Sequence, residues 1–176
     1  MTLADDPSRE DLRTATLERK VGVLVRRFRI IAEGMRDLPL CNPAIAVEAV
    51  DFRIHDGEGV GVLITPWFMN VVLLPLDDQP FEMAAMGRKR LVEMPAGPRE
   101  FLVGGDEVTG LFAAHSLHSP ILDVSSHDAA VAVARSALDK LMTPPPEEDE
   151  AIEPEAQSEA SPQPGTSRRT LLFGRR

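Results

Sequence analysis

Two histidines, His115 and His118, form the one pair in this sequence whose spacing suggests a metal site. They lie three residues apart, so they would share one face of a helix but point to opposite faces of a strand. A transition metal needs three or four ligands of matched softness, and the other histidines and the single cysteine, Cys41, are far away in the sequence. We therefore expect ordinary surface or loop histidines, no bound metal and no cofactor.

Motifs for covalent catalysis or phosphate binding are absent. The sequence contains no G-x-S-x-G, no glycine-rich phosphate loop and no H-E-x-x-H. Paired carboxylates such as Asp77 and Asp78 lie in polar segments, where solvent keeps both groups ionised and unsuited to acid–base catalysis. We therefore expect that the protein is not an enzyme.

A cluster of large apolar residues follows Pro66, namely Trp67, Phe68 and Met69, with Asn70 next. The alternation of side chains along a strand cannot turn all three into one core, so at least one should be exposed. One alternative is a bend in which Trp67 and Met69 pack inward and Phe68 closes a sheet edge. The other is a binding hot spot, because aromatic residues and methionine are preferred at protein interfaces.

The elements that position these residues follow the order helix, strands, helix. Apolar residues at steps of three and four from Leu17 to Met35 predict a helix that ends between Gly34 and Pro39. A capping-box spacing from Ser125 to Asp128 predicts the start of a closing helix. Between them we expect about five strands, antiparallel because their connections are short. They cover 47–54 (with Val50, Phe52 and Ile54 on one face), 60–65, 71–74, 88–93 and 99–103.

This order implies an α+β fold. We expect a two-layer sandwich in which the N- and C-terminal helices pack on one face of the antiparallel sheet. The other face of the sheet would then stay open, and an open face is a natural docking surface.

Composition divides the chain into a flexible N-terminus (1–15), a folded domain (16–142), an acidic Pro/Glu-rich linker (143–166) and a basic tail (167–176). The linker lacks the apolar surface needed to offset its ordering entropy, so we expect it to be disordered. The net charge of −9 argues against nucleic acid and anionic membranes as partners. No apolar run is long enough to span a bilayer, and we expect a cytoplasmic protein.

The tail sequence S-R-R-T-L-L at 167–172 resembles the core of a twin-arginine export motif. Arg168, Arg169, Leu171 and Leu172 occupy the motif positions, with Leu171 in place of a phenylalanine. We do not expect an export signal, because the motif lies at the wrong end and no apolar region follows it. It is either a solvated basic tail that folds back on the acidic linker, or a pseudosubstrate that occupies a groove meant for a partner's signal peptide.

Several blocks occur together in a recognisable order: C-N-P-A-I at 41–45, T-P-W-F-M-N at 65–70, P-A-G at 95–97 and S-L-H-S-P at 116–120. In this order they resemble the HybE/HupJ family of NiFe-hydrogenase assembly chaperones, over about residues 28–142. The resemblance implies a chaperone without catalytic activity. It also implies hydrogenase subunits as partners, notably the small-subunit precursor with its twin-arginine signal, and further the large subunit and other maturation factors.

We expect the partner-binding surface to lie in these blocks. One block departs from the family pattern, because His115 and His118 replace a cysteine and a phenylalanine and make that contact more polar. Two alternatives remain open: a metallochaperone that delivers nickel or iron through these histidines, and a scaffold that bridges other maturation factors. The residues expected to bind the partner are Asn42, Pro43, Trp67, Phe68, Met69, Asn70, Leu117 and His118.

Overall fold

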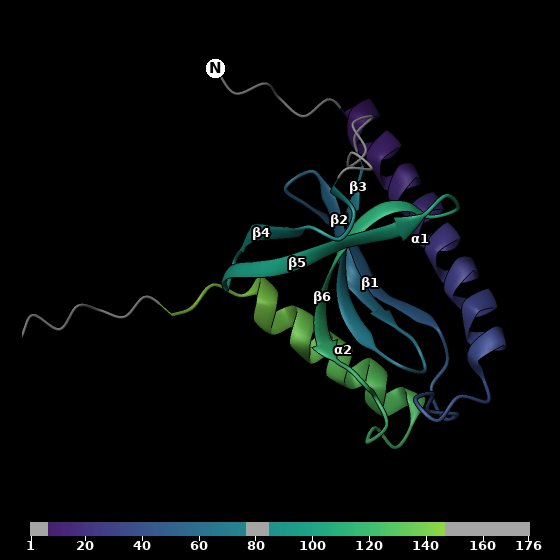
Figure 1. Cartoon of the computed structure of the whole chain (residues 1–176). Helices are drawn as coiled ribbons and strands as arrows, with labels where there is room; N and C mark the ends of the chain where they lie inside the picture. Colours follow the sequence, from purple (N-terminus) through teal and green to yellow (C-terminus); the bar gives the residue numbers. More distant parts are fainter. Residues whose placement is uncertain (1–6, 77–84, 147–176) are drawn as a thin grey trace, which may run out of the picture. The chain divides into compact units, whose positions relative to one another are not determined.

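The computed structural model describes residues 7–76 and 85–146, which form two helices and six strands (Figure 1). The linker from residue 147 onward and the basic tail 167–176 lie outside the described residues. The elements in chain order are α1 (Pro7–Met35), β1 (Glu48–His55), β2 (Glu58–Ile64), β3 (Met69–Pro75), β4 (Lys89–Met94), β5 (Gly97–Asp106), β6 (Gly110–His118) and α2 (His127–Met142).

The strands form one antiparallel sheet in the order β1-β2-β3-β6-β5-β4. This confirms the predicted α+β class, with one helix before the strands and one after them. The sheet has one strand more than expected, because β6 was not predicted. Its sequence contains Ala113, Ala114 and Ser116, whose small side chains weaken the alternation by which strands are recognised.

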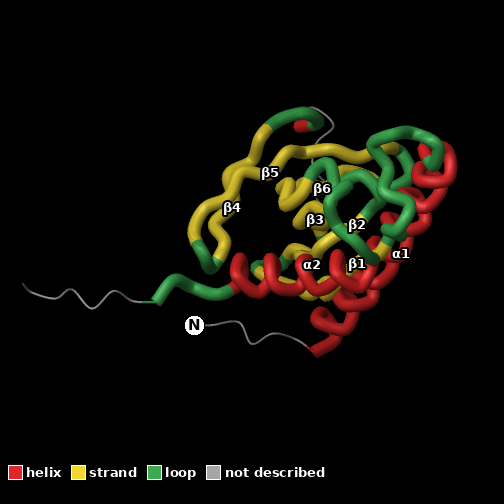
Figure 2. The backbone as a smooth tube through the Cα atoms, turned by 90° about the horizontal axis from the view of Figure 1, so that it is seen from below, coloured by secondary structure: helices red, strands yellow, loops and turns green. Residues whose placement is uncertain are grey.

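The helices lie on opposite faces of the sheet, so the expected placement of both on one face is wrong. In β3, Val71 packs in the core cluster with α2, whereas its neighbour Val72 packs in the cluster with α1. Successive residues of a strand point to opposite faces, so the layers are helix, sheet, helix. The continuous apolar runs of β2 and β3 are typical of strands buried on both faces. The sheet curves, with its concave side toward α2 (Figure 2).

A β-bulge in β1 changes which side chains share a face. Val50 is paired with Val62, but Arg53 is paired with Val60, so β1 holds one extra residue between these pairs. Asp51, which lies inside the bulge, has a φ of 49°. Val50 therefore packs on the α2 side, while Phe52 packs on the α1 side, and they do not share one face as expected.

The helix bounds differ slightly from those predicted. α1 begins at Pro7, so it includes much of the segment 1–15 that was expected to be flexible, and it ends at Met35 as predicted. The N-cap of α2 is Ser126, whose side chain accepts a hydrogen bond from the Ala129 amide, one residue later than the predicted capping box. Neither helix of the described ranges is long and apolar enough to cross a membrane.

Candidate partner-binding site

Three loops meet at one end of the sheet, and buried Asn42 joins them. Its Nδ2 donates hydrogen bonds to the carbonyl oxygens of Ile121 (2.9 Å) and Val124 (2.8 Å), and its Oδ1 accepts from the Ala44 amide. The Asn42 amide also donates to the carbonyl of Pro66. We call this region, formed by 38–47, 65–68 and 118–126, the loop end of the domain.

Buried Thr65 holds the connection between β2 and β3 in a tight turn. Its Oγ1 accepts hydrogen bonds from the amides of Phe68 (3.0 Å) and Trp67 (3.4 Å), and its own amide donates to the Phe68 carbonyl. Because the turn satisfies its own backbone groups, Trp67 and Phe68 are presented by a rigid loop.

An aromatic cluster forms around this turn. The ring of Phe28, from α1, lies 6.3 Å from Trp67, 5.7 Å from Phe68 and 6.3 Å from Phe112, measured between centroids. Trp67 and Phe68 are themselves 5.6 Å apart in an edge-to-face arrangement. Both remain half-buried, whereas Met69 is fully buried. The two aromatic side chains of the predicted set are therefore available to a partner, and Met69 belongs to the core.

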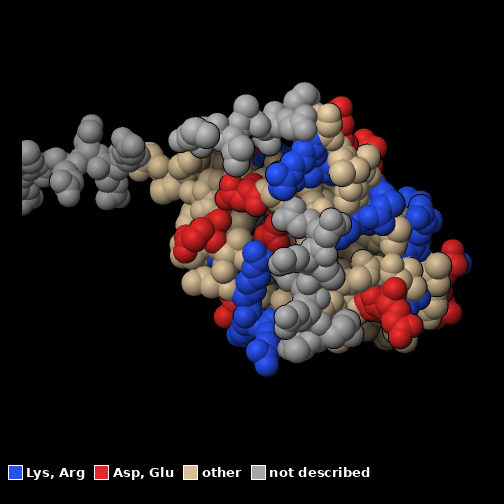
Figure 3. Space-filling view, turned by 90° about the horizontal axis from the view of Figure 1, so that it is seen from above, with Lys and Arg blue, Asp and Glu red and all other residues tan. Residues whose placement is uncertain are grey.

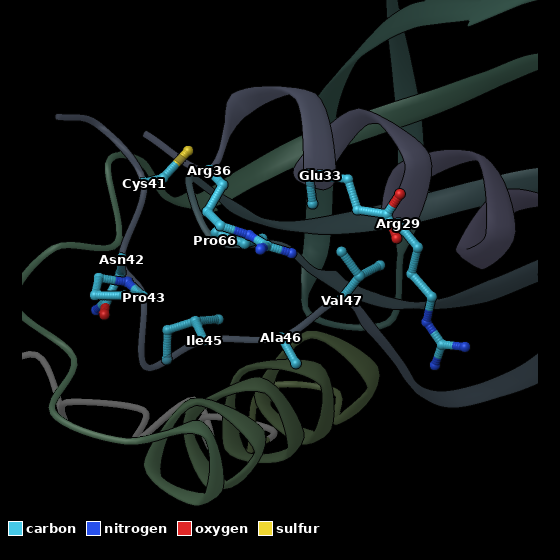
Figure 4. Close-up of a pocket in the computed structure, with 11 residues that line it drawn as sticks. Arg29, Glu33, Arg36, Cys41, Asn42, Pro43, Ile45, Ala46, Val47 and Pro66 are labelled. Carbon is cyan, nitrogen blue, oxygen red and sulfur yellow. The ribbon is translucent and has the colours of Figure 1, made fainter. Parts of the chain in front are cut away.

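A pocket of about 380 Å³ lies beside the cluster, between the last turns of α1 and the loop 41–47 (Figure 4). Ile45, Val47 and Pro66 give it apolar walls, and α1 contributes the charged side chains of Arg29, Glu33 and Arg36. Cys41 also lines it, and burial raises the pKa of that thiol. The pocket is thus an apolar recess that also carries two arginines and one glutamate.

Exposed apolar residues extend this surface. Leu38, Leu40 and Leu122 at the loop end are 45%, 40% and 51% exposed, and Pro43 is also exposed. Grouped exposed apolar side chains are typical of interaction sites. Sequence patterns gave no reason to select these leucines, because their loops show no periodicity. Phe28 was predicted only as part of the helix core.

The remaining predicted residues have mainly structural contacts. Leu117 packs against the α2-side core, and His118 Nε2 lies 2.6 Å from Asp123 Oδ1. That hydrogen bond lowers the pKa of the Asp123 carboxyl. Asn70 is half-buried on β3, two residues after Phe68 of the turn. The tail residues Arg168, Arg169, Leu171 and Leu172 lie outside the described residues.

The histidine pair does not converge on a common point. His115 Nδ1 lies 2.8 Å from the backbone oxygen of Glu100, and His118 is held by Asp123. In the described part of the chain, no three His, Cys, Asp or Glu side chains are grouped so that they could hold a metal ion.

Basic and acidic side chains are interspersed on the face seen in Figure 3, in small groups of each sign. One ion pair joins Arg27 of α1 to Asp106 of β5, and another joins Arg90 of β4 to Glu58 of β2. Among the described side chains visible in this view, no single large field of one sign marks a nucleic-acid or membrane surface.

Comparison with known proteins identifies the family. The family model described as "[NiFe]-hydrogenase assembly, chaperone, HybE" matches residues 19–174. Hydrogenase expression/formation protein HupJ of Bradyrhizobium diazoefficiens is 41% identical over 72% of this chain and 74% of its own length. Probable rubredoxin HupJ of Rhodobacter capsulatus is 39% identical over 71% of this chain, but the match spans only 45% of that protein.

A solved structure agrees with these matches. The solution structure of HybE from Escherichia coli superposes with a TM-score of 0.59 and 26% sequence identity, covering 89% of this chain and 90% of that one. This chain and HybE thus share one fold over most of their length. The chain belongs to the HybE family of [NiFe]-hydrogenase assembly chaperones.

Proposed function

We propose that this protein assists the assembly of a NiFe hydrogenase by holding the small-subunit precursor, with its twin-arginine signal, until the cofactors are inserted. The observation that carries the proposal is the rigid loop end, where half-buried Trp67 and Phe68 adjoin exposed leucines and an apolar pocket. Aromatic anchors in a well-packed surrounding supply most of the binding energy of protein interfaces. The protein itself performs no catalytic step.

The charge of the chain suits such a partner. A net charge of −9 attracts a basic signal region from a distance. The loop end, where Leu38, Leu40 and Leu122 are exposed, then contacts the apolar part of the partner. Because a precursor is met before its export, this function places the protein in the cytoplasm.

Titration calorimetry of the full-length protein tests the proposal. The ligands are the small-subunit precursor, the same subunit without its signal peptide, and the large subunit. We expect the precursor to bind more tightly than the signal-free form. Equal affinity for the two forms would show that the signal is not recognised, and binding of the large subunit alone would show that the partner is wrong.

The metallochaperone alternative is less well supported, because His115 and His118 have separate hydrogen-bond partners. Metal analysis of the purified protein separates the two functions. One equivalent of tightly bound nickel or iron would favour metal delivery.

A further inference from the structure

The described elements cover one face of the sheet only in part. α1 packs over the part of this face that contains Leu63 of β2 and Val72 of β3. Farther along the same face, toward the edge strand β4, apolar side chains remain in solvent, and β4 lies away from α1 (Figure 1). Leu102 of β5 is 52% exposed and Leu91 of β4 is 69% exposed. Exposed apolar side chains of this kind are typical of a surface that binds a partly apolar ligand.

A pocket of about 460 Å³ opens on this uncovered face, and we call it the β5 pocket. Leu102 and Ala114 are paired across β5 and β6, and together with Phe112 they provide its apolar part. Polar groups surround this apolar part. The complete lining is Asn70, Lys89, Glu100, Leu102, Gly104, Phe112, Ala114, His115 and Ser116.

The polar lining favours a ligand that donates hydrogen bonds. Among the described side chains, Asn70 Oδ1 is buried and has no hydrogen-bond partner, so a donor that reaches it would remove an unfavourable state. The Glu100 carboxylate is 2.7 Å from Lys89 Nζ, and both side chains are more than half exposed. Exposed Lys–carboxylate pairs are weak, whereas a guanidinium binds a carboxylate through two parallel N–H groups. The β5 pocket therefore suits an arginine flanked by apolar side chains.

The chain carries such a segment at its own C-terminus. We propose that the segment 167–172, S-R-R-T-L-L, occupies the β5 pocket of the same molecule. Arg168 or Arg169 would bind the Glu100 carboxylate, and the two leucines would cover Leu102. The inference concerns this chain alone, so it holds or fails independently of which hydrogenase subunit is the partner.

The chain path permits this contact. The Ala96 amide, in the turn between β4 and β5, donates to the Leu141 carbonyl, so the end of α2 lies beside that turn. Leu102 is five residues along β5 from Gly97, about 17 Å at the rise of a strand. The residues 147–166 join the domain to the segment, and a coil of that length spans about 25 Å root-mean-square. A chain of this length is therefore long enough to reach the pocket.

Tethering also makes a weak contact effective. A short flexible connection gives an effective concentration on the order of millimolar. A segment with a dissociation constant near that value would thus occupy the pocket for much of the time, and a tighter external ligand could still displace it.

Nuclear magnetic resonance of the full-length protein tests the proposal. The wild type is compared with the double variant Arg168→Ala/Arg169→Ala, and a synthetic peptide of residues 167–176 is titrated into both. We expect the backbone amide signals of Leu102, Ala114 and Ser116 to differ between the two proteins. We also expect the peptide to bind the double variant several-fold more tightly, because its pocket is vacated.

Two substitutions in the background of the double variant locate the contact. Glu100→Gln and Leu102→Ser should each weaken peptide binding at least several-fold, while Val108→Ser, an equally exposed apolar position at the turn between β5 and β6, should leave it unchanged. Glu100→Gln changes an exposed side chain and keeps the fold, which guards against a misfolded Leu102 variant. Unchanged pocket signals, peptide shifts confined to the loop end, or signals that depend on protein concentration would overturn the proposal.

Discussion

Trp67 shows how a single residue can be fixed by the fold and still be offered to a partner. Its ring packs on Phe28 and Phe68, yet it remains half-buried, and its backbone is held by Thr65. A side chain whose rotamer is already fixed loses little conformational entropy on binding. Trp67 contacts these half-buried rings, whereas the core around Met69 is fully buried. Removing the Trp67 side chain should therefore leave that core largely intact.

Replacing this side chain should therefore affect binding more than folding. We expect Trp67→Ala to weaken subunit binding by about 2 kcal/mol or more, as for a central aromatic anchor, while the domain stays folded. Calorimetric titration with the hydrogenase subunit measures the first effect and circular dichroism the second. Leu12→Ala, an exposed position near the start of α1, serves as the control. A Trp67 variant that binds as well as the wild type, or that loses its folded spectrum, contradicts the prediction.

At the scale of the elements, sequence patterns predicted α1, α2 and five of the strands. These patterns did not predict features that depend on contacts between residues far apart in the sequence. The bulge at Asp51 turns the Phe52 side chain to the α1 side of the sheet, opposite to Val50. A sequence pattern of period two cannot reveal one inserted residue. The opposite placement of the helices depends on long-range packing. The candidate site was predicted only in part, because Trp67 and Phe68 stand out by type, whereas Phe28 joins them only through the fold.

The contact between α1 and the turn between β5 and β6 makes the stability of the fold depend on pH. Hydrogen bonds from the Thr109 amide, and then from the Arg27 guanidinium, outweigh desolvation and lower the pKa of Asp106 from 3.8 to about 2. A group whose pKa is lower in the folded state stabilises the fold fully above its unfolded pKa. That contribution is lost as the pH falls from about 4 to about 2.

Neutralising Asp106 should remove this dependence. We expect Asp106→Asn to lower the free energy of unfolding by about 1 kcal/mol at pH 7, since its hydrogen bonds are partly exposed to solvent. Between pH 4 and pH 2 the stability of the variant should fall less steeply than that of the wild type. Urea unfolding at each pH measures both effects. Glu107→Gln, on the same turn, is the control, and an equally steep fall in the Asp106 variant would refute the assignment.

On the scale of the whole molecule, charge is divided along the chain. Seven carboxylates between Glu147 and Glu159 separate the domain from the four arginines between Arg168 and Arg176. The basic tail can therefore bind its own acidic segment or the domain. The β5 pocket favours the domain, because exposed Leu102 there matches Leu171 and Leu172, for which the acidic segment offers few apolar partners.

The proposed partner contact at the loop end leaves the β5 pocket free to take the arginines of the same partner's signal peptide. If the tail and those arginines compete for the β5 pocket, weakening the tail should strengthen the partner's binding. Lysine keeps the charge of Arg168 and Arg169 but cannot form the bidentate contact with Glu100. We therefore expect full-length Arg168→Lys/Arg169→Lys to bind a twin-arginine signal peptide more tightly than the wild type, as measured by calorimetry. Arg175→Lys/Arg176→Lys changes the same chemistry outside the motif and should leave the affinity unchanged. Equal or lower affinity in the first variant would show that the tail does not compete with the signal.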